Sequence, residues 1–102
     1  MRRRVSIFGS TGSVGQNTVS LIEEAGGSEA FEVVAVSGAG NVALLAEQAR
    51  RLGARIAVTA DETRLDALRD ALAGSGVEAA AGQAALVDAA SEPVDWGMSA
   101  IV

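Results

Sequence analysis

The sequence predicts an α/β fold of the Rossmann-like class, a doubly wound parallel sheet in a three-layer αβα arrangement. Short apolar runs rich in β-branched residues alternate with segments of helical periodicity, and glycine-rich turns separate them, which gives the order βαβαβαβαβ. Because this alternation requires crossovers between neighbouring strands, the strands are expected to be parallel and the crossovers right-handed.

A glycine turn joins the first strand directly to the first helix. The apolar run at residues 5–8 predicts the strand, and the helix is expected from residue 12 or 13 to residue 25. Gly26 and Gly27 then end it, as C-terminal glycines do. Its expected core face is Val14, Thr18, Ile22 and Ala25, with Val19 and Leu21 flanking that face.

The later elements follow the same alternation. Residues 31–37 form a mostly apolar run that fits a strand buried on both faces. Asn41 is a good N-cap for the next helix, which Gly53 ends, and Asp61 can cap a third helix. The remaining expected elements are strands at 55–59, 77–80 and 94–102, and helices at 42–52, 61–73 and 82–90.

The composition is that of one small globular domain. Of the 102 residues, 49% are hydrophobic and 21% are charged, and the core is expected to be aliphatic because two Phe and one Trp are the only aromatic residues. A net charge of -5 argues against nucleic acid as a partner. Arg2, Arg3 and Arg4 precede too short an apolar run for a signal peptide, and no stretch is long enough to span a membrane, so we expect a cytoplasmic protein.

The glycine turn has the features of a diphosphate-binding loop. Gly9, Gly12 and Gly15 follow the spacing G-x-x-G-x-x-G between a strand and a helix, where small residues let the backbone approach an anion at the helix N-terminus. The hydroxyl groups of Ser10, Thr11 and Ser13 are available to donate to phosphate oxygens. A tight βα turn without a ligand is the alternative.

The end of the second strand favours NADP over NAD. An NAD site has an Asp or Glu here for the ribose 2′-hydroxyl, and this chain has none at residues 37–41. Ser37 and Asn41 are candidate hydrogen-bond partners of the 2′-phosphate, although Asn41 serves equally well as a helix cap only. The nearest cations, Arg50 and Arg51, come late in the following helix, so the expected charge complement is weak.

The sequence predicts neither a catalytic residue nor a metal site in this chain. The carboxylates lie mainly on expected outer helix faces, and the chain has no His and no Cys. Ser and Thr lack a His or Lys that would act as their base. The chain is therefore expected to bind a cofactor without performing the chemistry.

The glycine motif and its surroundings resemble the 1-deoxy-D-xylulose 5-phosphate reductoisomerase family. Residues 9–15, followed by Gln16, Asn17, Thr18 and Val19, are similar to the family's opening motif. Three later pieces are similar in the same order, so the resemblance covers the whole chain: 33–36 with 41–42, then 82–85, then 94–95 with 98–102. The bare glycine motif also occurs in semialdehyde dehydrogenases and nucleotide-sugar epimerases.

The resemblance implies the N-terminal NADPH-binding domain, here residues 1–102, of a longer homodimeric enzyme. That enzyme uses Mg²⁺ or Mn²⁺ and NADPH to convert the sugar phosphate 1-deoxy-D-xylulose 5-phosphate to 2-C-methyl-D-erythritol 4-phosphate in non-mevalonate isoprenoid biosynthesis. Its metal ligands and substrate-phosphate site would follow residue 102, so this chain alone is expected to be inactive. Carried over by motif, the cofactor-binding residues are Thr11, Gly12, Ser13 and Val14 at the diphosphate, Ala39, Gly40 and Asn41 at the 2′-phosphate, and Ser99, Ala100 and Ile101 at the nicotinamide half.

One position departs from the family pattern. Before the Asn the family commonly has Gly and then Lys, Arg or Ser, whereas this chain has Ala39 and Gly40. The basic contact to the 2′-phosphate is therefore expected to be missing, which weakens the expected selectivity for NADPH over NADH. Because the chain stops inside its last apolar run, we expect a fragment of a longer protein. The alternatives are another NADP-dependent oxidoreductase domain, such as that of a semialdehyde dehydrogenase, and a stand-alone nucleotide-binding module.

Overall fold

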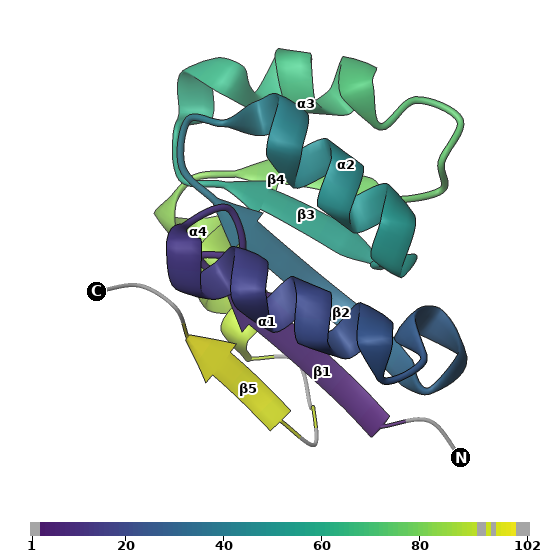
Figure 1. The fold of residues 1–102 in the computed structure, drawn as a ribbon. Helices are drawn as coiled ribbons and strands as arrows, with labels where there is room; N and C mark the ends of the chain where they lie inside the picture. The colour runs from purple at the N-terminus through teal and green to yellow at the C-terminus, as the bar shows by residue number, and fades with distance from the viewer. Residues whose placement is uncertain (1–2, 92–93, 95, 100–102) are drawn as a thin grey trace.

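Five parallel strands form a single sheet in the order β4-β3-β2-β1-β5 (Figure 1). The computed structural model describes residues 3–91, 94 and 96–99. Every neighbouring pair of strands is parallel, which confirms the predicted fold class. The strands are β1 (Arg3–Phe8), β2 (Phe31–Gly38), β3 (Ile56–Thr59), β4 (Glu78–Ala81) and β5 (Trp96–Ser99).

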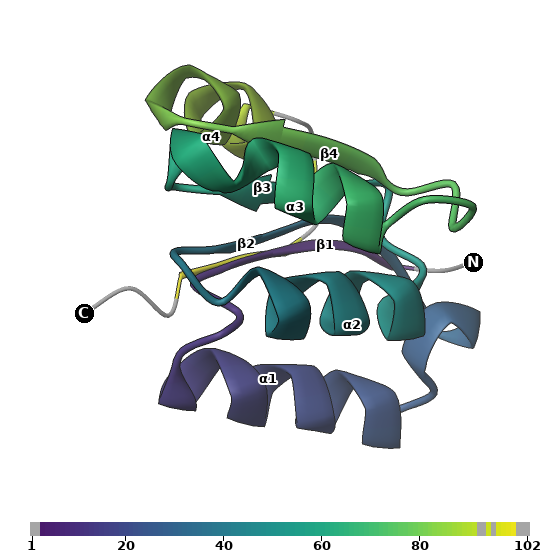
Figure 2. The ribbon, with the colours of Figure 1, turned by 90° about the horizontal axis from the view of Figure 1, so that it is seen from above.

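The helices cover the two faces of the sheet unequally. Three helices, α1 (Ser13–Glu24), α2 (Val42–Leu52) and α3 (Leu65–Ala71), pack on one face, and α4 (Gln83–Ala90) packs on the other (Figure 2). The strands β1 to β4 are added in one direction, and the chain then returns by way of α4 to place β5 on the free side of β1. Two short 3₁₀ helices, η1 (Gly27–Glu29) and η2 (Glu62–Arg64), complete the described elements.

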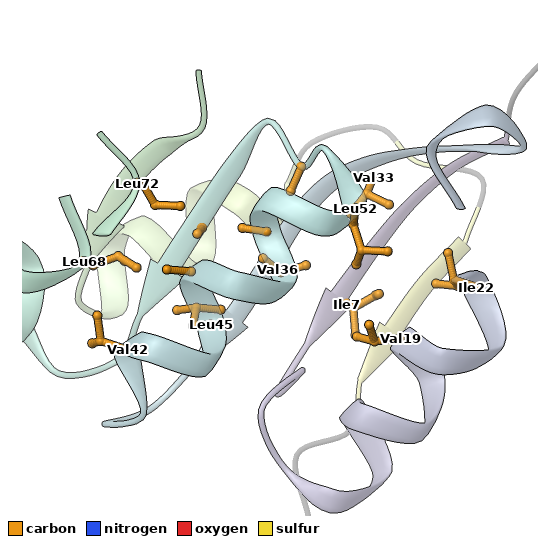
Figure 3. Packing of buried hydrophobic residues seen from close by; sticks show 14 of the residues in the cluster. Ile7, Val19, Ile22, Val33, Val36, Val42, Leu45, Leu52, Leu68 and Leu72 are labelled. Carbon is orange, nitrogen blue, oxygen red and sulfur yellow. The ribbon is translucent and has the colours of Figure 1, made fainter. Parts of the chain in front are cut away.

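The main core is aliphatic, as the composition predicts, and lies between the sheet and α1 to α3. Figure 3 shows Ile7 of β1, Val36 of β2, Leu45 and Leu52 of α2 and Leu68 of α3 within it. A smaller cluster of Ala35, Val58 and Ala89 lies between the sheet and α4, to which Ala89 belongs. Because both faces of the sheet are covered, the strands read as continuous apolar runs in the sequence.

Strand β2 contains one residue more than its register with β1 requires. Val5 pairs with Val33, but the next residue of β1, Ser6, pairs with Ala35. The extra residue shifts the alternation, so that Val33 and Val36 both join the main core although they are three positions apart. The periodicity of the sequence cannot reveal this shift, because every position from 33 to 36 is apolar.

The predicted elements are present, with corrections at α1 and α3. Residue 25 follows α1 as its C-cap, and Ala25 is exposed, whereas Val19 is buried beside Ile22, so the predicted core face of α1 was partly wrong. Asp61 caps η2 and not α3 itself. Within the predicted last strand, residues 95 and 100–102 lie outside the described residues.

Two adjacent positions of α1 test which face of this helix packs against the core. Replacing Ile22, which is 4% exposed, with Ala should lower the free energy of unfolding by about 2–4 kcal/mol, because the substitution leaves a cavity in the core. Leu21→Ala is the matched control, since Leu21 is 65% exposed, and should change stability by less than about 0.5 kcal/mol. Urea unfolding of both variants measures the difference. Equal losses would contradict the orientation of α1.

Candidate functional site

The glycine loop between β1 and α1 forms a tight turn at the carboxyl edge of the sheet. Gly9 has a φ of 79°, a left-handed conformation that favours glycine. Gly12 N–H donates to the Gly9 carbonyl at 3.2 Å and closes the turn. Gly12 is the N-cap of α1, with an ordinary φ of -76°.

Gly15 allows α1 to begin directly against this loop. A Cβ atom at residue 15 would lie 2.6 Å from Ser10 Cα and closer still to the Gly9 carbonyl oxygen. Any side chain would therefore push the first turn of the helix away from the loop. Gly12 differs, because a Cβ there would meet Gly9 O at 3.6 Å, an ordinary contact.

The N-terminus of α1 is open to an anion. Gln16 N–H donates to Gly12 O at 2.8 Å, so the N–H groups of residues 13–15 precede the hydrogen-bonded part of the helix. In the described part of the chain no side chain caps α1, and its first turn carries no acidic residue. The helix is 12 residues long, and its dipole favours negative charge at this end.

Ser10 and Ser37 hold the loop and do not face a ligand, which corrects their predicted role at the phosphates. Both are buried. Gly9 N–H donates to Ser37 Oγ at 3.0 Å, and the Ser10 N–H and Oγ both donate to the Ser37 carbonyl, at 2.8 and 3.2 Å. Their hydroxyl groups are therefore used inside the protein.

Gln48 is a further support of the loop that the sequence analysis missed. Its Nε2 donates to Ser10 O at 2.8 Å from a side chain that is 2% exposed. The signal in the sequence is a polar residue on the apolar face of a helix, between Leu45 and Leu52. Among the described residues its Oε1 has no hydrogen-bond partner, so a buried amide is kept here at some cost.

The second predicted site, at residues 39–41, adjoins the glycine loop. A Cβ at Gly38 would lie 2.8 Å from Thr11 Oγ1, so the two loops touch at these residues. Ala39, Gly40 and Asn41 are all exposed. The structure thus brings Thr11 and Gly12 to the same edge of the sheet as this second group.

Asn41 is the N-cap of α2, as predicted. Its Oδ1 accepts from Leu44 N–H at 3.2 Å. This bond does not use the NH₂ group of the carboxamide, which is a donor. The capping role is therefore compatible with binding a phosphate.

The third predicted group lies at the end of β5. Ser99 pairs in register with Phe8, the last residue of β1, so β5 ends beside the glycine loop. Ala100 and Ile101 lie outside the described residues, and the side chains of Ser13, Val14 and Ser99 are not described.

The β3–η2 loop brings charged residues to the same edge. The pKa of the Asp61 carboxyl is lowered, mainly by hydrogen bonds from the Thr63 hydroxyl and N–H and less by the charge of Arg64. Arg64 Nε lies 3.4 Å from Asp61 Oδ2. Within the described residues, no group of three His, Cys, Asp or Glu side chains is placed to hold a metal ion.

The chain is similar to known proteins over its full length. A family model described as 1-deoxy-D-xylulose 5-phosphate reductoisomerase matches residues 5–102. A reductoisomerase of that name from Jannaschia sp. is 65% identical over 99% of this chain and 25% of the relative. The chain thus spans about a quarter of the length of the curated relatives it matches.

Solved structures share the fold. The reductoisomerase of Zymomonas mobilis in complex with NADPH matches with a TM-score of 0.94 and 46% identity, over 99% of this chain and 26% of that one. A second reductoisomerase, in complex with NADPH, fosmidomycin and magnesium, has a TM-score of 0.87 at 24% identity, over 97% of this chain and 24% of that one.

Alanine substitutions should distinguish Gly15, which is needed for packing, from Gly12, where a side chain fits. Gly15→Ala should destabilise the protein by about 1–3 kcal/mol, because its Cβ meets backbone atoms that cannot move aside. Gly12→Ala should cost less than about 1 kcal/mol, since both its φ and the space around it admit a methyl group. Thermal or urea unfolding of the two variants measures this. A larger loss at Gly12 would refute the assignment.

Proposed function

The chain belongs to the 1-deoxy-D-xylulose 5-phosphate reductoisomerase family, and on this premise we propose that residues 1–102 are the NADPH-binding domain of such an enzyme. The enzyme would rearrange and reduce 1-deoxy-D-xylulose 5-phosphate to 2-C-methyl-D-erythritol 4-phosphate in isoprenoid biosynthesis. The family match over residues 5–102 favours this function over a semialdehyde dehydrogenase domain or a stand-alone nucleotide-binding module.

The observation that carries the proposal is the open N-terminus of α1 above a loop held by buried hydrogen bonds. The N–H groups of the first turn, which no side chain caps, and the helix dipole suit a diphosphate, and Gly12 leaves room for it. The Zymomonas mobilis relative, at 46% identity, is a complex with NADPH. Residues 11–14 would bind the diphosphate of the cofactor in this chain.

The two halves of NADPH would extend in opposite directions from the diphosphate. Residues 39–41 would receive the adenosine 2′-phosphate, because they follow β2 and include no carboxylate. Residues 99–101 would approach the nicotinamide, since β5 lies on the other side of β1. The nicotinamide supplies the hydride, and this domain supplies its position.

The divalent metal of the family does not fit the described residues, which offer no suitable group of ligands. As the family resemblance implies, the Mg²⁺ or Mn²⁺ ligands and the sugar-phosphate site would follow residue 102, and no step is derived through them here. The enzyme would be a homodimer, as the family resemblance implies, and cytoplasmic, as expected from the sequence. None of the described helices is long and apolar enough to cross a membrane.

A charge at Gly12 should abolish cofactor binding without harming the fold. Gly12→Asp places a carboxylate where the diphosphate would lie, so the Kd for NADPH should rise by about 100-fold or more. The unfolding temperature should hold or rise, because Asp is a good N-cap at the positive end of α1.

Gly12→Asn is the matched control for this substitution. It has the same shape and capping ability without the charge, so its loss of affinity should be much smaller. Fluorescence titration with NADPH, together with thermal unfolding, measures both variants. Equal losses for Asp and Asn would show that bulk and not charge matters, and unchanged affinity for Asp would refute the diphosphate site.

The reaction itself is tested on the full-length protein. It should oxidise NADPH only when 1-deoxy-D-xylulose 5-phosphate and Mg²⁺ or Mn²⁺ are both present, and chelation of the metal should stop the reaction. Absorbance at the NADPH band follows the rate. NADPH binding without turnover of this sugar phosphate would keep the cofactor domain and overturn the proposed substrate.

A further inference from the structure

The guanidinium of Arg64 lies beside Gly40, the position where the family commonly has Lys, Arg or Ser. A Cβ atom built on Gly40 would lie 3.7 Å from Arg64 Nε. Arg64 belongs to η2, after β3, yet its guanidinium adjoins the β2–α2 loop. The folded chain therefore places a cation beside this loop, although residues 39–41 carry none.

Hydrogen bonds fix the backbone that carries Arg64 to the β2–α2 loop. Thr59 Oγ1 donates to the Ala39 carbonyl at 2.6 Å and accepts from Asp61 N–H at 3.2 Å. Ala60 N–H donates to Gly38 O at 2.8 Å, and Arg64 N–H to Asp61 O at 3.0 Å. Hydrogen bonds thus hold the two loops together.

Asp61 orients the Arg64 guanidinium. Its Oδ2 lies 3.4 Å from Arg64 Nε, while its Oδ1 accepts from Thr63 N–H at 3.0 Å and from Thr63 Oγ1 at 2.5 Å. The Asp61 carboxylate thus accepts from Thr63 and pairs with Arg64. The ion pair uses Nε. None of these three interactions involves the two Nη groups of Arg64.

Elsewhere in the described chain the arginines lie away from this edge. Arg3, Arg4 and Arg55 stand at or before the amino ends of strands, and Arg50, Arg51 and Arg69 lie in the last turns of α2 and α3. Arg51 pairs with Glu23 and Glu47, and Arg69 pairs with Asp66. Arg64 is the described arginine at the carboxyl edge.

We propose that Arg64 binds the 2′-phosphate of the cofactor and so supplies the selectivity for NADPH over NADH that Gly40 does not. A guanidinium binds phosphate oxygens through paired N–H groups, and the 2′-phosphate is the group that NADH lacks. This inference rests on the NADPH site proposed above. The cation for the 2′-phosphate would thus come from the β3–η2 loop and not from the β2–α2 loop.

The test compares cofactors on the full-length protein and its Arg64→Gln variant. The Kd for NADPH should rise about tenfold while the Kd for NADH stays within about twofold, because only NADPH carries the phosphate. Adenosine 2′,5′-bisphosphate, titrated against 5′-AMP, should show the same loss without involving the nicotinamide. Added salt should reduce the wild-type preference, as expected for a half-exposed charge.

Two further variants control the result. Arg69→Gln removes the same charge and the same kind of pair, since Arg69 and Asp66 are also three residues apart, and should leave both affinities unchanged. Gly40→Arg added to Arg64→Gln should restore the NADPH preference, because its side chain would start beside the vacated guanidinium position.

The outcomes separate the inference from the proposed function. If the wild type binds neither cofactor, the NADPH site and this inference are both overturned. If it binds both without preference, prefers NADH, or keeps its NADPH affinity in Arg64→Gln, the inference is overturned and the dinucleotide site remains. Equal loss of NADPH and NADH in Arg64→Gln would give Arg64 a structural role and overturn it too.

Discussion

The hydrogen bonds between Ser37 and the glycine loop are the constraint on which the rest of the site depends. Ser37 accepts through both its hydroxyl and its carbonyl, and Gln48 holds Ser10 from the other side. The bonds that Ser10 makes with Ser37 and Gln48 are buried, so breaking one would leave a polar group without water or a partner. They fix the loop relative to β2, and because Gly15 seats α1 on the same loop, they also fix the direction in which the helix N-terminus points.

The same constraint explains why the three glycines are not equivalent. Gly9 provides a left-handed turn and Gly15 a close contact, and both serve the fold. Gly12 meets no such demand, since its φ is ordinary and a Cβ would fit. We infer that Gly12, which is exposed, instead keeps the backbone accessible to a ligand at the N-terminus of α1.

The sequence predicted most of the fold because its elements have clear signals. The strands are apolar runs, and Asn41 and Gly53 mark the limits of α2. It failed where the answer depends on contacts between loops. A serine hydroxyl in the sequence looks the same whether it binds a ligand or, as in Ser10, a neighbouring carbonyl. The sequence comparison at Gly40 concerned one loop, whereas the cation that we propose for the 2′-phosphate belongs to the next one.

In a parallel sheet, a residue from one βα loop is generally expected to lie beside the ligand site of another βα loop. Every βα loop of this sheet leaves from the same edge, so residues distant in sequence meet around one ligand. The attraction between a cation and a phosphate depends on their separation and on the solvent between them, not on which loop carries the cation. A family motif transferred position by position records only one way of supplying that charge. In this domain the β2–α2 loop, which has no carboxylate, would contribute the amide of Asn41. The β3–η2 loop would contribute the positive charge.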